Sequence, residues 1–126
     1  MRSPETSAIY FSSGARVVAE VVRDQADLER GLSRRVAVPE GTGMLFDMGR
    51  TDAHRFWMRG TLVALDIVFL AADGAVVGVV EDARPLDATP RWVPQPSRYV
   101  LEVPAGWCAR SGVVVGERAV FVALPA

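Results

Sequence analysis

The sequence contains no lysine and no asparagine, and it has a single cysteine, Cys108, and a single histidine, His54. One cysteine excludes a disulfide within the chain, and one cysteine with one histidine is too few for a zinc site built from such ligands. The net charge of -1 gives no positive field that would attract nucleic acid. We therefore expect no metal site, no cofactor and no nucleic-acid partner.

All fourteen basic residues are arginines. A guanidinium group matches a carboxylate through two parallel hydrogen bonds, which the compact ammonium group of lysine does not do. Any charged partner of a buried aspartate or glutamate in this chain is therefore expected to be an arginine.

Long apolar runs are also missing. The longest one is far shorter than the roughly 20 residues that a membrane-spanning helix needs, and residues 1–14 lack the apolar core of a signal peptide. If the chain is complete, we expect a cytoplasmic protein without a membrane span. A chain from which a signal peptide had been removed would look the same and would be exported.

Half of the 126 residues are hydrophobic and 23% are charged, which is typical of a folded chain with one core. We expect a flexible N-terminal segment at residues 1–14 and a single domain at residues 15–126. Short apolar runs between polar turns predict strands, and Asp73-Gly74 predicts a hairpin turn. The expected strands are residues 17–22, 44–46, 55–58, 62–71, 75–80, 98–103 and 118–124, with loops at residues 47–52 and 82–97.

Two short helices are expected near residues 24–33 and 104–111. Asp24 can cap the first helix. Pro104 and Gly112 stand where the start and the end of the second helix favour them. The predicted fold class is α+β, a single compact β-rich domain with a mainly antiparallel sheet that is sandwich or barrel-like.

Seven stretches carry a resemblance to a known family: Glu29-Arg30-Gly31-Leu32, Gly43-Met44-Leu45-Phe46, Phe56-Trp57-Met58-Arg59-Gly60-Thr61, Leu65-Asp66-Ile67, Asp73-Gly74, Tyr99-Val100-Leu101-Glu102 and Ala105-Gly106. In this order they are similar to a small bacterial and archaeal family of unknown function, DUF192, also written UPF0127, over about residues 17–122. The resemblance implies a compact β-rich α+β domain, often exported behind a signal peptide, with no agreed activity. Gly60 departs from the family pattern, in which asparagine is common before Thr61.

Asp66 is the one charged residue in the apolar run 62–71. A carboxylate in a buried strand must find a partner or take up a proton, because an unpaired buried charge is costly. Asp66 is therefore either a structural anchor that accepts hydrogen bonds from the Arg59–Thr61 turn, or part of a small-ligand site. The residues that could line such a site with it are Trp57, Met58 and Thr61.

Arg98 and Glu102 lie four residues apart on one face of the strand 98–103, and either could face Asp66. Two carboxylates that share a site would raise the pKa of one of them and supply an acid/base pair. The alternative is an ion pair between Arg98 and one of the two carboxylates.

Three other residues have two interpretations each. We expect His54 to be a surface residue rather than a general base, and Cys108 to be a packed residue rather than a reactive thiol. Trp92 lies among four prolines, so it either contacts a ligand or covers the core.

The sequence leaves three classes of function open: a binding module for a small molecule or an extended peptide, a carboxylate enzyme that uses Asp66 and Glu102, and a structural or accessory protein. We favour the non-enzymatic binding module, because the sequence has no nucleophile motif and no phosphate-binding loop. The oligomeric state is left open. The expected ligand-binding residues are Trp57, Met58, Thr61, Asp66, Trp92, Arg98 and Glu102.

Overall fold

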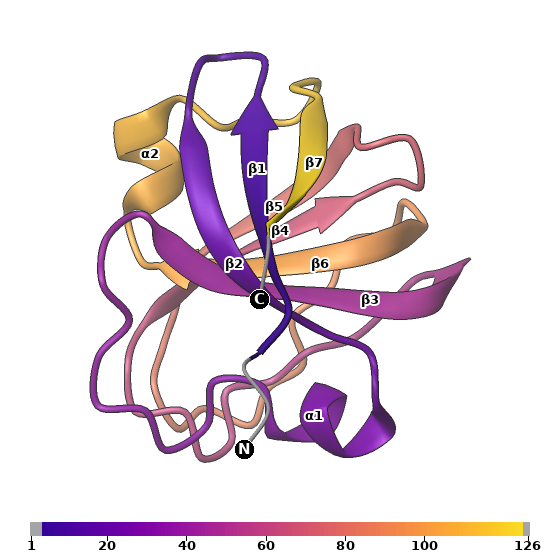
Figure 1. Cartoon of the computed structure of the whole chain (residues 1–126). Helices are drawn as coiled ribbons and strands as arrows, with labels where there is room; N and C mark the ends of the chain where they lie inside the picture. The colour runs from indigo at the N-terminus through magenta and orange to yellow at the C-terminus, as the bar shows by residue number, and fades with distance from the viewer. Residues whose placement is uncertain (1–3, 125–126) are drawn as a thin grey trace.

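The computed structural model describes residues 4–124, which form one seven-stranded sheet and two short helices (Figure 1). In chain order the elements are β1 (Thr6–Phe11), β2 (Arg16–Val22), α1 (Gln25–Arg30), β3 (Thr42–Asp52), β4 (Leu65–Leu70), β5 (Val76–Ala83), β6 (Ser97–Pro104), α2 (Trp107–Ser111) and β7 (Ala119–Leu124).

The strands follow the order β5-β4-β6-β3-β2-β1-β7 across the sheet. Neighbouring strands are antiparallel except β2 and β3, which are parallel because the chain crosses over through α1 between them. The sheet is open but strongly curled, and its two edges meet at one corner, where Ala75 bridges Arg118. A single β-rich α+β domain with a mainly antiparallel sheet is therefore confirmed.

The curled sheet buries both of its faces. One face encloses a core that α2 closes with Trp107 and Cys108. The other face is covered by α1 with the segment that follows it, and by the long connections 53–64 and 84–96; these contribute Leu32, Met58 and Val93, respectively, to a second core. β4 lies between the two cores, and all six of its residues are buried. This double burial explains why its sequence is a continuous apolar run rather than an alternating one.

The boundary predicted at residue 14 needs correction. Residues 6–11 form β1, which pairs with β2 on one side and with β7 on the other. Ile9 is fully buried in the first core. The short run of β1 is apolar enough to serve as a strand once the turn after Phe11 folds it back onto β2. Residues 1–3 of the predicted flexible segment lie outside the described residues.

Two other segments differ from the predictions. Residues 47–52, expected as a loop, continue β3 through a register shift between Asp47 and Asp52, and Gly49 within it has a φ of 76°. Residues 55–58, expected as a strand, make a single bridge between Phe56 and Arg91. Residues 47–52 are polar and include a glycine, which is typical of a loop, but they form the bulged end of a strand.

The two helices occur where they were expected but are shorter. α1 spans Gln25–Arg30 and stops at Gly31, whose φ is 49°. α2 begins at Trp107 because Pro104 still belongs to β6. Neither N-cap residue makes a side-chain hydrogen bond, so these helices depend on packing more than on capping.

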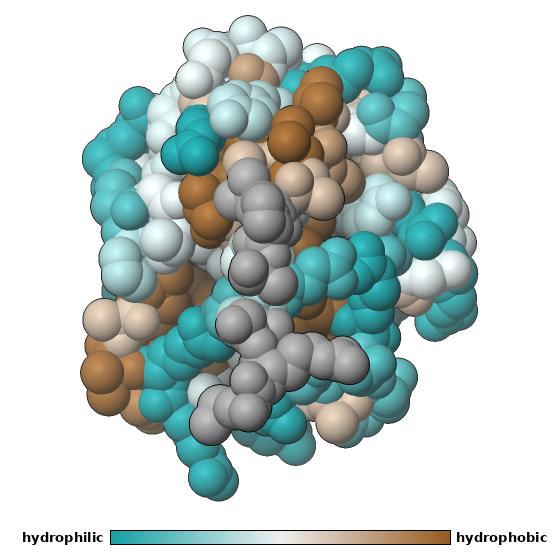
Figure 2. Space-filling view, in the orientation of Figure 1, coloured by the Kyte–Doolittle hydropathy of each residue, from teal (hydrophilic) through white to brown (hydrophobic). Residues whose placement is uncertain are grey.

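β7 is one of the two edge strands, and Val120 and Val122 on it are exposed. In Figure 2 hydrophobic residues gather over β7, whose one partner in the sheet is β1. An edge of this kind is where a further strand can pair.

The close approach of β3 to β6 yields a stability prediction. A Cβ atom on Gly43 would lie 2.4 Å from the carbonyl oxygen of Glu102, which is backbone and has little room to move. We expect Gly43→Ala to lower the free energy of unfolding by about 2–3 kcal/mol, measured by urea denaturation.

Gly78→Ala provides the matched control. Its added Cβ would meet the side chain of Val93, at 2.4 Å, rather than backbone. We expect a smaller loss of about 1 kcal/mol, because Val93 lies in the connection 84–96, whose backbone can shift more readily than that of β6. Equal losses for Gly43→Ala and Gly78→Ala would contradict this account of the β3–β6 contact.

Candidate functional site

Asp66 lies in β4 and points into the first core, where it is fully buried. Its carboxylate accepts three backbone hydrogen bonds: from Asp82 at 2.9 Å, from Gly106 at 3.1 Å and from Cys108 at 3.0 Å. These donors come from the end of β5 and from the start of α2, not from the Arg59–Thr61 turn that the sequence suggested. The arrangement is that of a structural anchor.

A bulge in β5 aims one of these donors. Leu65 pairs with Ala83 and Ile67 pairs with Val80, so two residues of β5 stand opposite Asp66 alone. The extra residue, Asp82, has a φ of 54° and turns its N–H group toward the carboxylate.

Asp66 and Glu102 do not share a site. In the β4–β6 ladder Asp66 pairs with Val103, whereas Glu102 pairs with Ile67. Paired residues project to the same face of a sheet and successive residues to opposite faces, so the two carboxylates point to opposite sides. The predicted acid/base pair is therefore wrong.

The ion pair expected for Arg98 also differs. Its guanidinium Nε lies 3.1 Å from Oδ1 of Asp47 on β3, and it contacts neither Asp66 nor Glu102. Met58 is fully buried in the second core and does not line the pocket described next.

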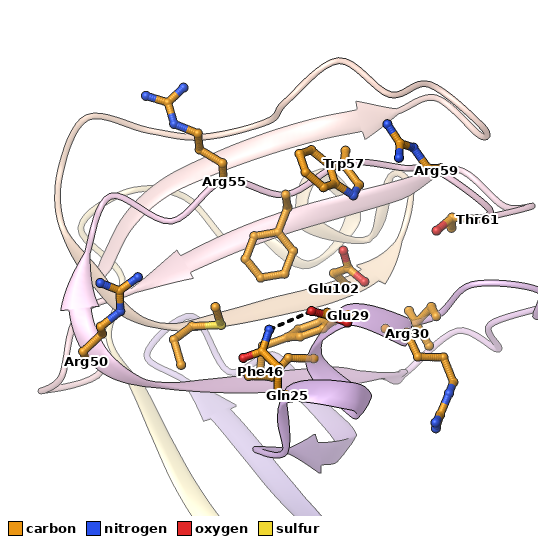
Figure 3. Close-up of a pocket in the computed structure, with 15 residues that line it drawn as sticks. Gln25, Glu29, Arg30, Phe46, Arg50, Arg55, Trp57, Arg59, Thr61 and Glu102 are labelled. Carbon is orange, nitrogen blue, oxygen red and sulfur yellow. Dashed lines mark hydrogen bonds between the residues drawn. The ribbon is translucent and has the colours of Figure 1, made fainter.

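A pocket of about 500 Å³ opens between α1, β3 and the connection 53–64. Figure 3 shows its contents, with the carboxyl group of Glu102 near the centre of the view and Trp57 and α1 on opposite sides. The lining residues are Gln25, Leu28, Glu29, Arg30, Gly31, Leu32, Phe46, Met48, Arg50, Arg55, Phe56, Trp57, Arg59, Thr61 and Glu102. Three of the predicted ligand residues, Trp57, Thr61 and Glu102, are thus brought together.

Glu102 forms the base of this pocket and is only 5% exposed. Burial raises its pKa to about 8, so the carboxyl group is mostly protonated at neutral pH. Within residues 4–124 no side chain or backbone group forms a hydrogen bond or an ion pair with this carboxyl group. A neutral, unpartnered acid at the base of a pocket can donate or accept a hydrogen bond.

Aromatic rings form the apolar walls. Phe46 and Phe56 meet edge to face at a centroid distance of 4.9 Å, and Phe56 meets Phe69 of β4 in the same way at 6.3 Å. Trp57 stands at the mouth and is 52% exposed. Gly31 keeps this space open, because a Cβ atom there would lie 3.2 Å from the ring of Phe46.

Four arginines surround the pocket, and sequence reasoning missed them as site residues. Arg30 pairs with Asp27 and Arg50 with Asp52. The signal available in the sequence was the spacing of Arg50, Arg55 and Arg59 around Trp57, but three arginines in an irregular segment are as typical of a solvated surface.

The other two arginines rest on tryptophan rings. The guanidinium carbon of Arg55 lies 4.5 Å from the ring centroid of Trp92, and that of Arg59 lies 5.5 Å from the ring centroid of Trp57. Trp92 does not line the pocket itself. It contacts the pocket through Arg55, which is neither of the two roles that the sequence suggested.

The single histidine and the single cysteine lie outside the pocket. His54 is 6% exposed, and its Nε2 lies 3.0 Å from the carbonyl oxygen of Arg50, so the prediction of a surface histidine is wrong. Cys108 is buried in the first core, as predicted. Burial, together with the nearby Asp66 carboxylate, raises the pKa of its thiol to about 12.

Gly60 has a φ of 74°, a left-handed conformation that glycine adopts freely and asparagine tolerates better than most residues. Glycine therefore forms this backbone turn without strain. Gly60 does not line the pocket, whereas the neighbouring Thr61 does.

No three histidine, cysteine, aspartate or glutamate side chains gather closely enough to hold a metal ion among residues 4–124. Over the same residues, no helix has the length and apolar character needed to cross a membrane.

Comparison with known proteins identifies a family and several crystal structures, of which two are described here. The DUF192 family model, described as "Uncharacterized ACR", matches residues 8–121. A Sinorhizobium meliloti 1021 protein described as a "putative transcription regulator" is 33% identical, with a TM-score of 0.87 over 94% of each chain. A protein of unknown function from Novosphingobium aromaticivorans DSM 12444 is also 33% identical, with a TM-score of 0.83 over 91% of this chain and 83% of that chain. No curated protein matches this chain.

The anchor at Asp66 gives a prediction. Asp66→Asn keeps the volume but turns an amide group toward backbone N–H donors, so at least one donor loses its acceptor. We expect the free energy of unfolding to fall by about 3 kcal/mol in urea denaturation. Asp24→Asn is the control, because Asp24 makes no side-chain cap hydrogen bond, and it is expected to change stability by less than about 0.5 kcal/mol. Similar small effects of both changes would rule out the anchor.

The buried acid gives a prediction about pH. In the unfolded chain Glu102 loses its proton near its ordinary pKa, whereas in the folded protein it keeps the proton up to about pH 8. The folded state then binds more protons than the unfolded state, so the free energy of unfolding falls as the pH rises from 5 to 8. Relative to Glu102→Gln, the wild type is expected to lose up to about 4 kcal/mol over this range.

Urea denaturation at several pH values measures this difference, and Glu29→Gln is the control because Glu29 lines the same pocket but is exposed. A pH dependence that is the same in wild type and Glu102→Gln would show that Glu102 is ionised in the folded protein.

Proposed function

Since this chain belongs to the DUF192 family, which has no assigned activity, we propose that it is a non-enzymatic binding module for a small molecule. The proposed site is the pocket between α1, β3 and the connection 53–64. It replaces the site around Trp57 and Asp66 that the sequence suggested, because Asp66 points into the opposite core.

The observation that carries this proposal is the buried acid of Glu102 at the base of a pocket. Removing a carboxyl group from water costs free energy, and burial of Glu102 raises its pKa to about 8. A group retained at such a cost is typical of a functional site. The volume of about 500 Å³, the aromatic walls and the few polar groups also match a small-ligand pocket.

The two alternatives have less support. An acid/base enzyme would need Asp66 beside Glu102, but Asp66 lies on the other face of the sheet and accepts hydrogen bonds from three backbone N–H groups. An accessory role through pairing at an edge strand is favoured only by the exposed valines of β7. A small-molecule site is supported by the pocket, its walls and Glu102 together.

Protein-observed NMR with a library of small aromatic compounds tests the proposal. We expect some compounds to shift the amide signals of residues 28–31, 46–50 and 55–61. Leu28→Trp adds bulk to the pocket wall and is expected to abolish these shifts, whereas Val115→Trp adds the same bulk at an exposed position outside the pocket and is expected to keep them. Absence of binding at these residues, or equal binding to both variants, would refute the proposal.

A further inference from the structure

The pocket is positively charged in a chain whose net charge is -1. Four arginines line it, and the acidic side chains that line it are Glu29 and Glu102. Glu102 is mostly protonated at neutral pH, so it does not offset the guanidinium charges. A concave site with this balance attracts anions and repels cations.

Two of the four guanidinium groups are available to a ligand. Among residues 4–124, no carboxylate forms an ion pair with Arg55 or Arg59. Instead, each is held by a tryptophan ring, at 4.5 Å for Arg55 and 5.5 Å for Arg59. Contact with an aromatic face orients a guanidinium group and leaves its N–H donors free to bind an anion. In Figure 3 these two side chains stand on either side of Trp57.

The interior of the pocket differs from its mouth. Phe56 and Trp57 offer apolar surface, and Phe46, only 1% exposed, packs edge to face against Phe56. The most buried polar side chains that line it are Thr61, with its hydroxyl group, and Glu102, with its carboxyl group. Flat apolar surface with neutral hydrogen-bonding groups below and unpaired cations above is suited to a ligand with two distinct ends.

We infer that the pocket takes an organic anion with a flat apolar body. Its anionic group is drawn to Arg55 and Arg59 at the mouth, its body lies against the aromatic walls, and its other end meets the carboxyl group of Glu102 at the base. This inference rests on the proposed function and adds the class of ligand to it.

The same arrangement makes binding depend on pH. The charged groups that line the pocket with Glu102 are Glu29 and Arg30 from α1, Arg50 from β3, and Arg55 and Arg59 from the connection. When the pH rises above about 8, Glu102 ionises and places a negative charge at the base. The ionised Glu102 then repels an anionic ligand and can no longer donate a hydrogen bond to it, so the affinity for the ligand falls.

Three probes with the same aromatic body test the ligand class: 1-naphthoate, neutral 1-naphthamide and cationic 1-naphthylmethylamine. Affinities are measured by NMR titration at pH 6.5, with Leu28→Trp to show that each probe occupies the pocket. We expect naphthoate to bind about tenfold more tightly than naphthamide and the cation to bind most weakly.

Arginine variants identify the groups responsible. Arg59→Gln is expected to weaken naphthoate about fivefold and to leave naphthamide unchanged, a moderate effect because water screens this exposed side chain. Arg84→Gln is the matched control, since Arg84 is exposed and lies outside the pocket. Raising the pH to 9.5 is expected to weaken naphthoate in the wild type but not in Glu102→Gln.

The outcomes separate the two proposals. Equal binding of naphthoate and naphthamide in the pocket, or a preference for the cation, would overturn the ligand class while the binding function stands. An equal effect of Arg59→Gln and Arg84→Gln would overturn the role given to the arginines at the mouth. Failure of every probe to bind in the pocket, together with a library that shows no binding there, would refute the proposed function itself.

Discussion

The carboxylate of Asp66 joins two stretches of backbone, the end of β5 and the start of α2, to β4. It accepts N–H groups from the end of β5 and from both sides of the start of α2, which lie 16, 40 and 42 residues away in the sequence. The donors at Gly106 and Cys108 belong to the first turn of α2, where backbone N–H groups have no partner within the helix. One buried charge therefore replaces the missing cap of a five-residue helix and also holds the bulge in β5.

This anchor determines where the other buried carboxylate points. With Asp66 committed to the face toward α2, the antiparallel register of β4 and β6 sends Glu102 to the opposite face. The two acids consequently have different roles in the structure. Asp66 is saturated by local donors, whereas Glu102 has none among residues 4–124 and remains neutral at the base of a pocket. A shift of one residue in this register would exchange the two faces.

The sequence was enough to identify Asp66 as a buried carboxylate, and to predict β4, β6 and the hairpin after Asp73, because these features depend on residues close together in the chain. It did not predict the burial of Glu102, which depends on the elements that cover that face of β6. It did not identify the three donors of Asp66 or the partner of Arg98, since both depend on pairing between distant segments. β1 was missed for the same reason, as its six residues gain their burial only between β2 and β7. The arginines of the pocket lie in a connection without periodicity, where no sequence pattern distinguishes a binding group from a solvated one.

All basic residues that line this pocket are arginines, since the chain contains no lysine. A lysine at position 55 or 59 would carry the same charge, but its compact and strongly hydrated ammonium group would stack less well on a tryptophan ring. Trp57 and Trp92, which the sequence suggested as walls for a ligand, each support a guanidinium group at the mouth. Groups that are already oriented lose less conformational entropy when they bind. Folding thus buries Glu102 and orients these arginines before any ligand binds. Such preorganisation is what favours tight binding.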